Sequence, residues 1–227
     1  VMPCTAKKFE AKRPEMGHDG MSDVDVVITT RELARMIKKA GIDFNNLPDE
    51  LFDDKMGQSS GAGVIFAATG GVMEAALRTV YEKMTGKILE KVDFHEVRGL
   101  GDIKEATIQI GDTAVNVAVA HGTANAGRLL ESVRNGEKTY HFIEVMACPG
   151  GCVNGGGQPI VSAQKRMEVD QRQLRAKAIY NEDLGKPIRK SHENPEIQAL
   201  YETYLGEPNS HKAHELLHTH YVKREKY

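Results

Sequence analysis

The stretch "ATIQIGDTAVNVAVAHG" (residues 106–122) decides the fold class of this 227-residue chain. Apolar and polar residues alternate on both sides of Gly111-Asp112, which predicts a β-hairpin with a tight turn. A helical stretch, "TANAGRLLESVRNG" (123–136), follows, and then a strand, "YHFIEVMAC" (140–148). Strands that alternate with helices indicate an α/β fold, with mixed sheet layers flanked by helices.

The upstream sequence adds further elements of the same kind. The β-branched run "VDVVI" (24–28) predicts a short buried strand, and "TTRELARMIKKAG" (29–41) predicts a helix that Gly41 ends. A second helix should begin near Gly70 or Gly71 and end at Gly86. The residues predicted to share one face of this helix are Met73, Ala76, Leu77, Val80 and Met84.

The amino-acid composition changes near Gln164, where charged sequence with a helical pattern begins, such as "AQKRMEVDQRQLRAKAIYNEDLG" (163–185). We therefore expect two parts, residues 1–163 as the α/β part and residues 164–227 as a helical C-terminal extension.

Composition excludes several classes of partner. The net charge is −2 and no long Lys/Arg stripe is present, so we expect no nucleic acid partner. The most apolar window, "GVIFAATGGVM" (63–73), is too short for a membrane span. No signal peptide opens the sequence, and three cysteines do not make a disulfide framework in a chain this long. These features predict a reducing compartment and a cytoplasmic location.

Two of the three cysteines lie in "MACPGGCVNGGGQP" (146–159). Pro149, Gly150 and Gly151 favour a loop between Cys148 and Cys152, and such a loop can point its N–H groups at thiolates. Three interpretations remain open: buried cysteines without a chemical role, a zinc site, and an iron–sulfur cluster. Both metal sites require about four ligands.

The third cysteine, Cys4, lies in "MPCTAKKFE" (2–10), before Lys7 and Lys8. Nearby positive charge favours a thiolate. Three cysteines leave one ligand missing, and position 1 is a Val followed by Met2, so we expect a fourth ligand upstream of Val1.

These two motifs resemble the second and third cluster-binding signatures of iron-only (FeFe) hydrogenases. A third stretch, "GVIFAATGGVMEAALRTVYE" (63–82), is similar to another part of the same active-site domain. Residues 191–221 resemble the segment that two-subunit members of the family carry on a separate small subunit. The resemblance thus identifies residues 1–163 with the C-terminal part of the H-cluster domain and residues 164–227 with a small-subunit-like extension.

The resemblance implies a specific ligand set. Cys4, Cys148 and Cys152 would ligate a four-iron four-sulfur cluster. The sulfur of Cys152 would also bridge to a two-iron subcluster that carries CO, cyanide and a bridging dithiolate.

The resemblance also implies which side chains surround the two-iron subcluster. Met2 and Met146 would pack around it, Lys7 would donate a hydrogen bond to a cyanide ligand, and Phe66 would line the pocket. Ala67 departs from the Gly that often follows this Phe. The family's first signature, which carries the fourth cluster cysteine and the cysteine that hands on protons, is absent from this sequence.

The implied activity is the reversible oxidation of dihydrogen to protons and electrons. An upstream lobe or a companion chain would supply the fourth cysteine, and the electron carrier would be ferredoxin or NAD(P)-linked subunits. Three rival interpretations stay open: a non-enzymatic iron–sulfur assembly protein of the same family, a sensory hydrogenase, and a zinc-stabilised interaction module.

Other polar residues have simpler interpretations. Glu74 is expected to be a favourable charge in the first turn of its helix. Gly70 and Gly71 either let a helix N-terminus approach an anionic cluster or permit close packing. His211, His214 and His218 share one helical face, where surface packing is favoured over metal binding.

Overall fold

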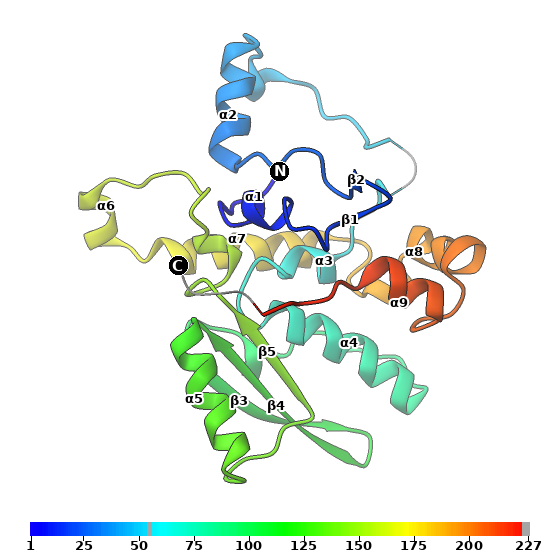
Figure 1. The fold of residues 1–227 in the computed structure, drawn as a ribbon. Coiled ribbons are helices and arrows are strands. Elements are labelled where there is room, and N and C mark those ends of the chain that lie inside the picture. The colour runs from blue at the N-terminus through cyan, green and yellow to red at the C-terminus, as the bar shows by residue number, and fades with distance from the viewer. Residues whose placement is uncertain (54–55, 224–227) are drawn as a thin grey trace. The chain divides into compact units, whose positions relative to one another are not determined.

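The computed structural model describes residues 1–53 and 56–223, which fall into two compact units (Figure 1). The first unit contains residues 1–52, 156–159 and those from Pro195 onward. The second contains residues 53–155 and 160–194.

A three-stranded mixed sheet forms the centre of the second unit. Its strands are β3 (Ile103–Ile110), β4 (Thr113–His121) and β5 (Phe142–Met146), in the order β3-β4-β5. The β3–β4 pair is antiparallel and the β4–β5 pair is parallel. The predicted hairpin is confirmed, because Ile110 pairs with Thr113 across the Gly111-Asp112 turn.

Helices cover both faces of this sheet (Figure 1). On one face, Met73 and Leu77 of α4 (Gly71–Thr85) pack against the inward side chains of β3 and β4. On the other face, Leu129 of α5 (Thr123–Arg134) packs on Ala118 and Ala120. This alternation follows from the two-residue period of a strand, and the predicted α/β class is confirmed.

The second unit also contains helices and short helical turns outside these two layers. The helix α7 (Gln171–Gly185) packs on α3 (Gly61–Ile65) and α4, where Ile179 and Tyr180 contact Ala62, Ile65 and Ala75. The boundary predicted between residues 163 and 164 stays a prediction, and residues 224–227 of the predicted extension lie outside the described residues. The elements are α3 (Gly61–Ile65), η2 (His95–Val97), η3 (Cys152–Asn154), α6 (Ala163–Glu168), α7 (Gln171–Gly185) and η4 (Ser191–Glu193).

Among the described residues of the first unit, the longest helix is α2 (Thr30–Lys39). Thr29 and Glu32 form a capping box, in which the Glu32 N–H donates to Thr29 Oγ1 and the Thr29 N–H donates to Glu32 Oε2. The predicted helix is confirmed. The other elements are α1 (Lys7–Glu10), β1 (Gly17–His18), β2 (Met21–Ser22), η1 (Phe44–Asn46), α8 (Pro195–Leu200), the π-helix η5 (Tyr201–Leu205) and α9 (His211–Leu217).

The strand predicted at 24–28 is wrong. Residues 24–28 have no strand assignment, and Val24 and Val26 are exposed. An isolated bridge joins Met2 to Thr29, directly after this run. A β-branched run becomes a strand only where another strand offers a ladder of hydrogen bonds, and no described segment does so here.

The helix predicted from Gly70 or Gly71 to Gly86 is confirmed, but its predicted face is partly wrong. Val80 and Met84 are exposed, whereas Glu74 and Arg78 are completely buried. The side of α4 that carries Glu74 and Arg78 faces charged partners on neighbouring segments, so these two polar side chains are buried there. No helix among the described residues is long and apolar enough to cross a bilayer.

Candidate functional site

The cysteine loop, residues 147–155, begins where β5 ends at Met146. The Gly151 N–H donates to the carbonyl of Cys148, and the Gly155 N–H donates to the carbonyl of Cys152, both at 2.9 Å. Cys148 and Cys152 are both half-buried. The loop therefore folds back on itself twice within eight residues and presents two thiols from one end of the sheet.

The loop is attached to the segment that follows α3. The Thr69 N–H donates to the carbonyl of Gly150 (3.1 Å), and the Val153 N–H donates to the carbonyl of Ala67 (2.9 Å). Gly151 has a φ of +92°, and a Cβ there would lie 2.7 Å from Thr69 N and 2.9 Å from Met146 Sδ. Only glycine permits this approach.

These contacts bring four of the predicted site residues into one region of the second unit. Met146 and both cysteines belong to the strand end and the loop. Phe66 directly precedes Ala67, to which the loop is bonded, and its side chain is 47% exposed.

The helix α7, which belongs to the predicted C-terminal extension, also contacts this loop. Arg175 Nη1 on α7 donates to the carbonyl of Val153 at 3.0 Å. The residue next to Cys152 is thus held by a side chain that lies 22 positions further along the chain.

Glu144 on β5 is a buried residue of this region that the sequence analysis missed. Its carboxylate accepts hydrogen bonds from the N–H groups of Gly70 (2.6 Å) and Met73 (2.7 Å), so it caps the N-terminus of α4. Burial raises the pKa of Glu144. The signal in the sequence is a carboxylate in the middle of an otherwise apolar strand, and in the structure Glu144 holds the one buried position of β5.

The cap decides between the two interpretations of Gly70 and Gly71. The amides of Gly70 and Met73 at the start of α4 are taken by Glu144, and a Cβ on Gly70 would lie 1.9 Å from the carbonyl oxygen of Val97. Close packing is therefore the observed role of Gly70.

Lys104 on β3 contacts the segment between α3 and α4 at Thr69. Its Nζ donates to the carbonyls of Thr69 (3.0 Å) and Gly99 (2.9 Å). Burial lowers the pKa of Lys104 to about 8. The lysine thus ties the 98–100 loop to the peptide that bonds the cysteine loop.

The other predicted site residues, Met2, Cys4 and Lys7, lie in the first unit. Met2 bridges Thr29, and the carbonyl of Pro3 accepts a hydrogen bond from the Gly157 N–H at 3.0 Å. Lys7 forms an ion pair with Glu10.

Cys4 and Lys7 share a hollow of about 470 Å³. Arg13 and Tyr221 also line it, and the Arg13 guanidinium stacks over the Tyr221 ring at 5.0 Å. The convergence of Cys4 with Cys148 and Cys152, and the individual roles of the site residues, stay predictions.

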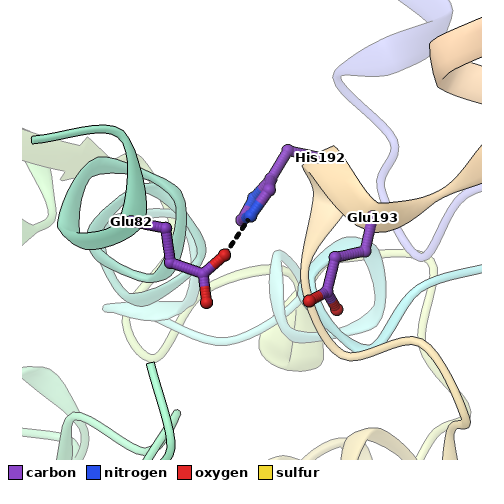
Figure 2. Close-up of side chains that lie close together, drawn as sticks. All are labelled: Glu82, His192 and Glu193. Atoms are coloured by element: carbon purple, nitrogen blue, oxygen red, sulfur yellow. Dashed lines mark hydrogen bonds and ion pairs between the residues drawn. The ribbon is translucent and has the colours of Figure 1, made fainter. Parts of the chain in front are cut away.

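Glu82, His192 and Glu193 form a cluster of potential metal ligands (Figure 2). His192 Nε2 lies 2.7 Å from Glu82 Oε2, and its Nδ1 lies 3.0 Å from the hydroxyl of Thr79. The ammonium of Lys190 donates to both carboxylates, at 2.6 and 2.8 Å. Lys190 already neutralises the two carboxylates, and both imidazole nitrogens of His192 have partners, so the cluster is not a metal centre. These contacts join α4 to η4, and we call Glu82, Lys190, His192 and Glu193 together the Glu82 clasp.

Three carboxylates and three arginines form a network around α4, with three side chains fully buried and three partly buried. Arg78 donates to Glu74 at 2.8 Å and to both oxygens of Asp183 at 2.9 and 2.8 Å, and all three side chains are fully buried. Arg98 bonds Glu74 and Asp93, while Arg189 bonds Asp93 and Asp183. The partners hold the pKa of Asp183 below its usual range although burial opposes this shift. Glu74 lies in the first turn of α4, as predicted, and it is in addition a buried ion-pair partner of Arg78 and Arg98.

Comparison with known protein families identifies the family of this chain. Residues 1–156 match the family model described as the iron only hydrogenase large subunit, C-terminal domain. The chain belongs to this family. Residues 169–224 match the iron hydrogenase small subunit.

Relatives fall into two groups. The chain is 55% identical over its whole length to the NADP-reducing hydrogenase subunit HndD of Solidesulfovibrio fructosivorans, covering 38% of that protein. It is 52% identical over 98% of its length to iron hydrogenase 1 of Clostridium pasteurianum, covering 39% of it. It is also 32% identical, over its whole length, to the cytosolic Fe-S cluster assembly factor narfl of Xenopus tropicalis, covering 47% of it.

Solved structures agree in fold. A variant of the FeFe hydrogenase HydA1 from Chlamydomonas reinhardtii matches 97% of this chain with a TM-score of 0.75 and 44% identity, and the match covers 62% of that chain. The present chain thus spans about two fifths of its hydrogenase relatives by sequence.

The residues present fit an iron–sulfur cluster in their chemistry. Three cysteines are available, thiolates are the ligands that such clusters take, and two of the cysteines lie on one glycine-rich loop beside Met146.

Proposed function

We propose that this chain forms part of the catalytic centre of an FeFe hydrogenase, which oxidises dihydrogen reversibly to protons and electrons. It would supply three ligands of a four-iron four-sulfur cluster and much of the wall around a two-iron subcluster that carries CO, cyanide and a bridging dithiolate. The proposed ligands are Cys4, Cys148 and Cys152, and the proposed wall residues are Met2, Lys7, Phe66 and Met146.

The observation that carries the proposal is the difference in identity between the two groups of relatives. The chain shares 55% and 52% identity with two hydrogenases but 32% with an assembly factor of the same family. Within the first unit, the Gly157 N–H donates to the carbonyl of Pro3, the residue next to the proposed ligand Cys4.

When bound, the metal group supplies an iron with an open position, a nearby base and a route for electrons. The task of this chain is to hold and surround that group. Cys152, proposed as the bridging ligand, is followed directly by Val153, which both Ala67 and Arg175 fix. Met2, Met146 and Phe66 offer apolar surface that excludes water, and Lys7 offers a cation to an anionic ligand.

The electron carrier and partners are part of the same proposal. A relative named as an NADP-reducing subunit favours electron transfer to companion subunits linked to NAD(P), and ferredoxin is the alternative carrier. The fourth cluster cysteine would come from an upstream lobe or a companion chain, and the proposed location is the cytoplasm.

The test is the metal content of the protein after expression with the maturation machinery for the two-iron subcluster. We expect iron but not zinc, infrared bands of CO and cyanide, and hydrogen uptake. Iron without these bands would favour the assembly-factor alternative, and zinc alone would favour an interaction module.

A matched pair of variants tests the role proposed for Lys7. Lys7→Asn should leave the four-iron cluster intact but remove a charge-assisted hydrogen bond worth about 1.5–3 kcal/mol, so the retained CO and cyanide bands should weaken. Lys8→Asn is the control, because Lys8 instead donates to Glu32 at 2.8 Å. Equal bands in both variants would return Lys7 to a surface role.

A further inference from the structure

A pocket of about 260 Å³ lies beside the cysteine loop in the second unit. Its wall includes Thr69, the 98–100 loop, Gly150 and Tyr180 of α7. Gly150 lies between Cys148 and Cys152 in sequence, and its carbonyl bonds Thr69. The pocket therefore adjoins the backbone that carries two of the proposed cluster ligands.

Two residues of this wall carry a hydroxyl group that has no hydrogen-bond partner among the described residues. These groups are Thr69 Oγ1 and the phenol oxygen of Tyr180, and both atoms are buried. The whole Thr69 residue is only 2% exposed. A buried hydroxyl without a partner costs free energy, and folded proteins commonly satisfy such groups with ordered water.

The charges around the pocket favour a neutral occupant. Arg98, the one charged residue in its described wall, already donates to Glu74 and Asp93. Its guanidinium also stacks over the Tyr180 ring at 4.2 Å. Burial raises the pKa of Tyr180, so its hydroxyl keeps its proton and can donate a hydrogen bond.

We propose that this pocket holds ordered water bonded to Thr69 and Tyr180, and that this water raises the reduction potential of the iron–sulfur cluster that the cysteine loop would hold. The inference rests on the proposed function. A water molecule takes about 30 Å³ in the liquid, so the pocket has room for several. Reduction adds negative charge to a cluster, and nearby water dipoles stabilise the more negative state.

Two variants remove the hydroxyls with little change of shape. Tyr180→Phe keeps the ring on which Arg98 stacks, and Thr69→Val keeps the branched side chain. Each should lower the reduction potential of the four-iron cluster, and the double variant should lower it further. Tyr140→Phe is the control, because the Tyr140 hydroxyl bonds Glu105, and neither residue lines the pocket.

The measurement is a redox titration of the cluster-loaded full protein, followed by electron paramagnetic resonance. Deuteron couplings after exchange into D₂O are recorded on the reduced cluster. We expect the wild type and Tyr140→Phe to share their potential and couplings, and the pocket variants to lose couplings as their potential falls. A purely structural role would change thermal stability without this loss of deuterons.

Two outcomes would overturn the inference. One is a wild-type potential and wild-type couplings in a folded, cluster-loaded Tyr180→Phe variant. The other is a high-resolution structure of the wild-type protein with a dry pocket, which needs no variant to fold. A wild-type protein that binds no iron–sulfur cluster would instead contradict the proposed function itself.

Discussion

Arg78 is the residue whose environment differs most from that of an ordinary helix arginine. Its guanidinium is completely buried, and it bonds Glu74, Asp183 and the carbonyls of Val92 and Arg189. A buried charge is tolerated only when its partners compensate for the lost hydration. Arg78 therefore joins α4 to α7 and to the segment that follows α7.

Replacing this arginine tests how much the network stabilises the fold. Arg78→Met should lower the free energy of unfolding by about 3–5 kcal/mol, because Glu74 and Asp183 stay buried without their shared cation. Denaturant unfolding of the full protein measures the effect. Arg134→Met is the control, since Arg134 pairs with Glu131 on the surface and such pairs contribute about 0–1 kcal/mol. A loss below 1 kcal/mol at Arg78 would show that the buried carboxylates find other partners.

At the scale of elements, α4 is held at both ends by carboxylates. Glu144 of β5 caps its N-terminus, and Glu82 near its C-terminus bonds Lys190 and His192 beside η4. The segment that bonds the cysteine loop lies between α3 and the capped end. The position of α4 thus fixes the Ala67 and Thr69 backbone groups from which the loop hangs.

The Glu82 clasp predicts a pH dependence. The hydrogen bond from Lys190 is the main cause that lowers the pKa of Glu82 to about 2. A carboxylate with a lowered pKa in the folded state stabilises the protein above its unfolded pKa of about 4.5 and loses this contribution as the pH falls toward 2. Glu82→Gln should therefore lose less stability than the wild type between pH 5 and pH 3.

Unfolding midpoints measured across this pH range test the clasp. Glu131→Gln on the surface of α5 is the control and should follow the wild-type slope. A Glu82→Gln slope equal to that of the wild type would mean that the clasp does not contribute to acid sensitivity.

At the scale of the whole molecule, order should follow burial in each unit. The central strand β4 pairs on both sides, and its residues 117–121 are all buried. Residues 47–53 have no helix or strand, and Leu51 and Phe52 are 97% and 84% exposed. Hydrogen exchange reports such differences because amides exchange through local opening.

We expect amide exchange in the intact protein to be slowest in β4 and fastest in residues 47–53, by mass spectrometry of peptides. The cysteine loop should fall between them, since two inter-segment backbone bonds hold it. Strong protection of residues 47–53 would indicate that another chain or a further part of the protein covers Leu51 and Phe52.

Elements whose signals lie within a few neighbouring residues could be predicted from the sequence. Alternation around Gly111-Asp112 predicted the β3–β4 hairpin, and Thr29, Gly70 and Gly86 marked ends of helices. These signals suffice because a turn or a cap is made by neighbours in sequence. The two cysteine motifs likewise led to the family, which the family model then showed.

Features that depend on partners far away in the sequence became visible in the three-dimensional structure alone. Residues 24–28 do not form a strand because none of the described segments offers them a ladder partner, although their composition favours a strand. Nothing in the local sequence distinguishes Glu74 and Glu144 from ordinary surface carboxylates. In the structure, Glu74 accepts hydrogen bonds from Arg78 and Arg98, and Glu144 accepts one from the Gly70 N–H at the start of α4. A buried charge is tolerated only where a partner compensates for its lost hydration. Here that partner lies on another segment, and only the fold brings the two together.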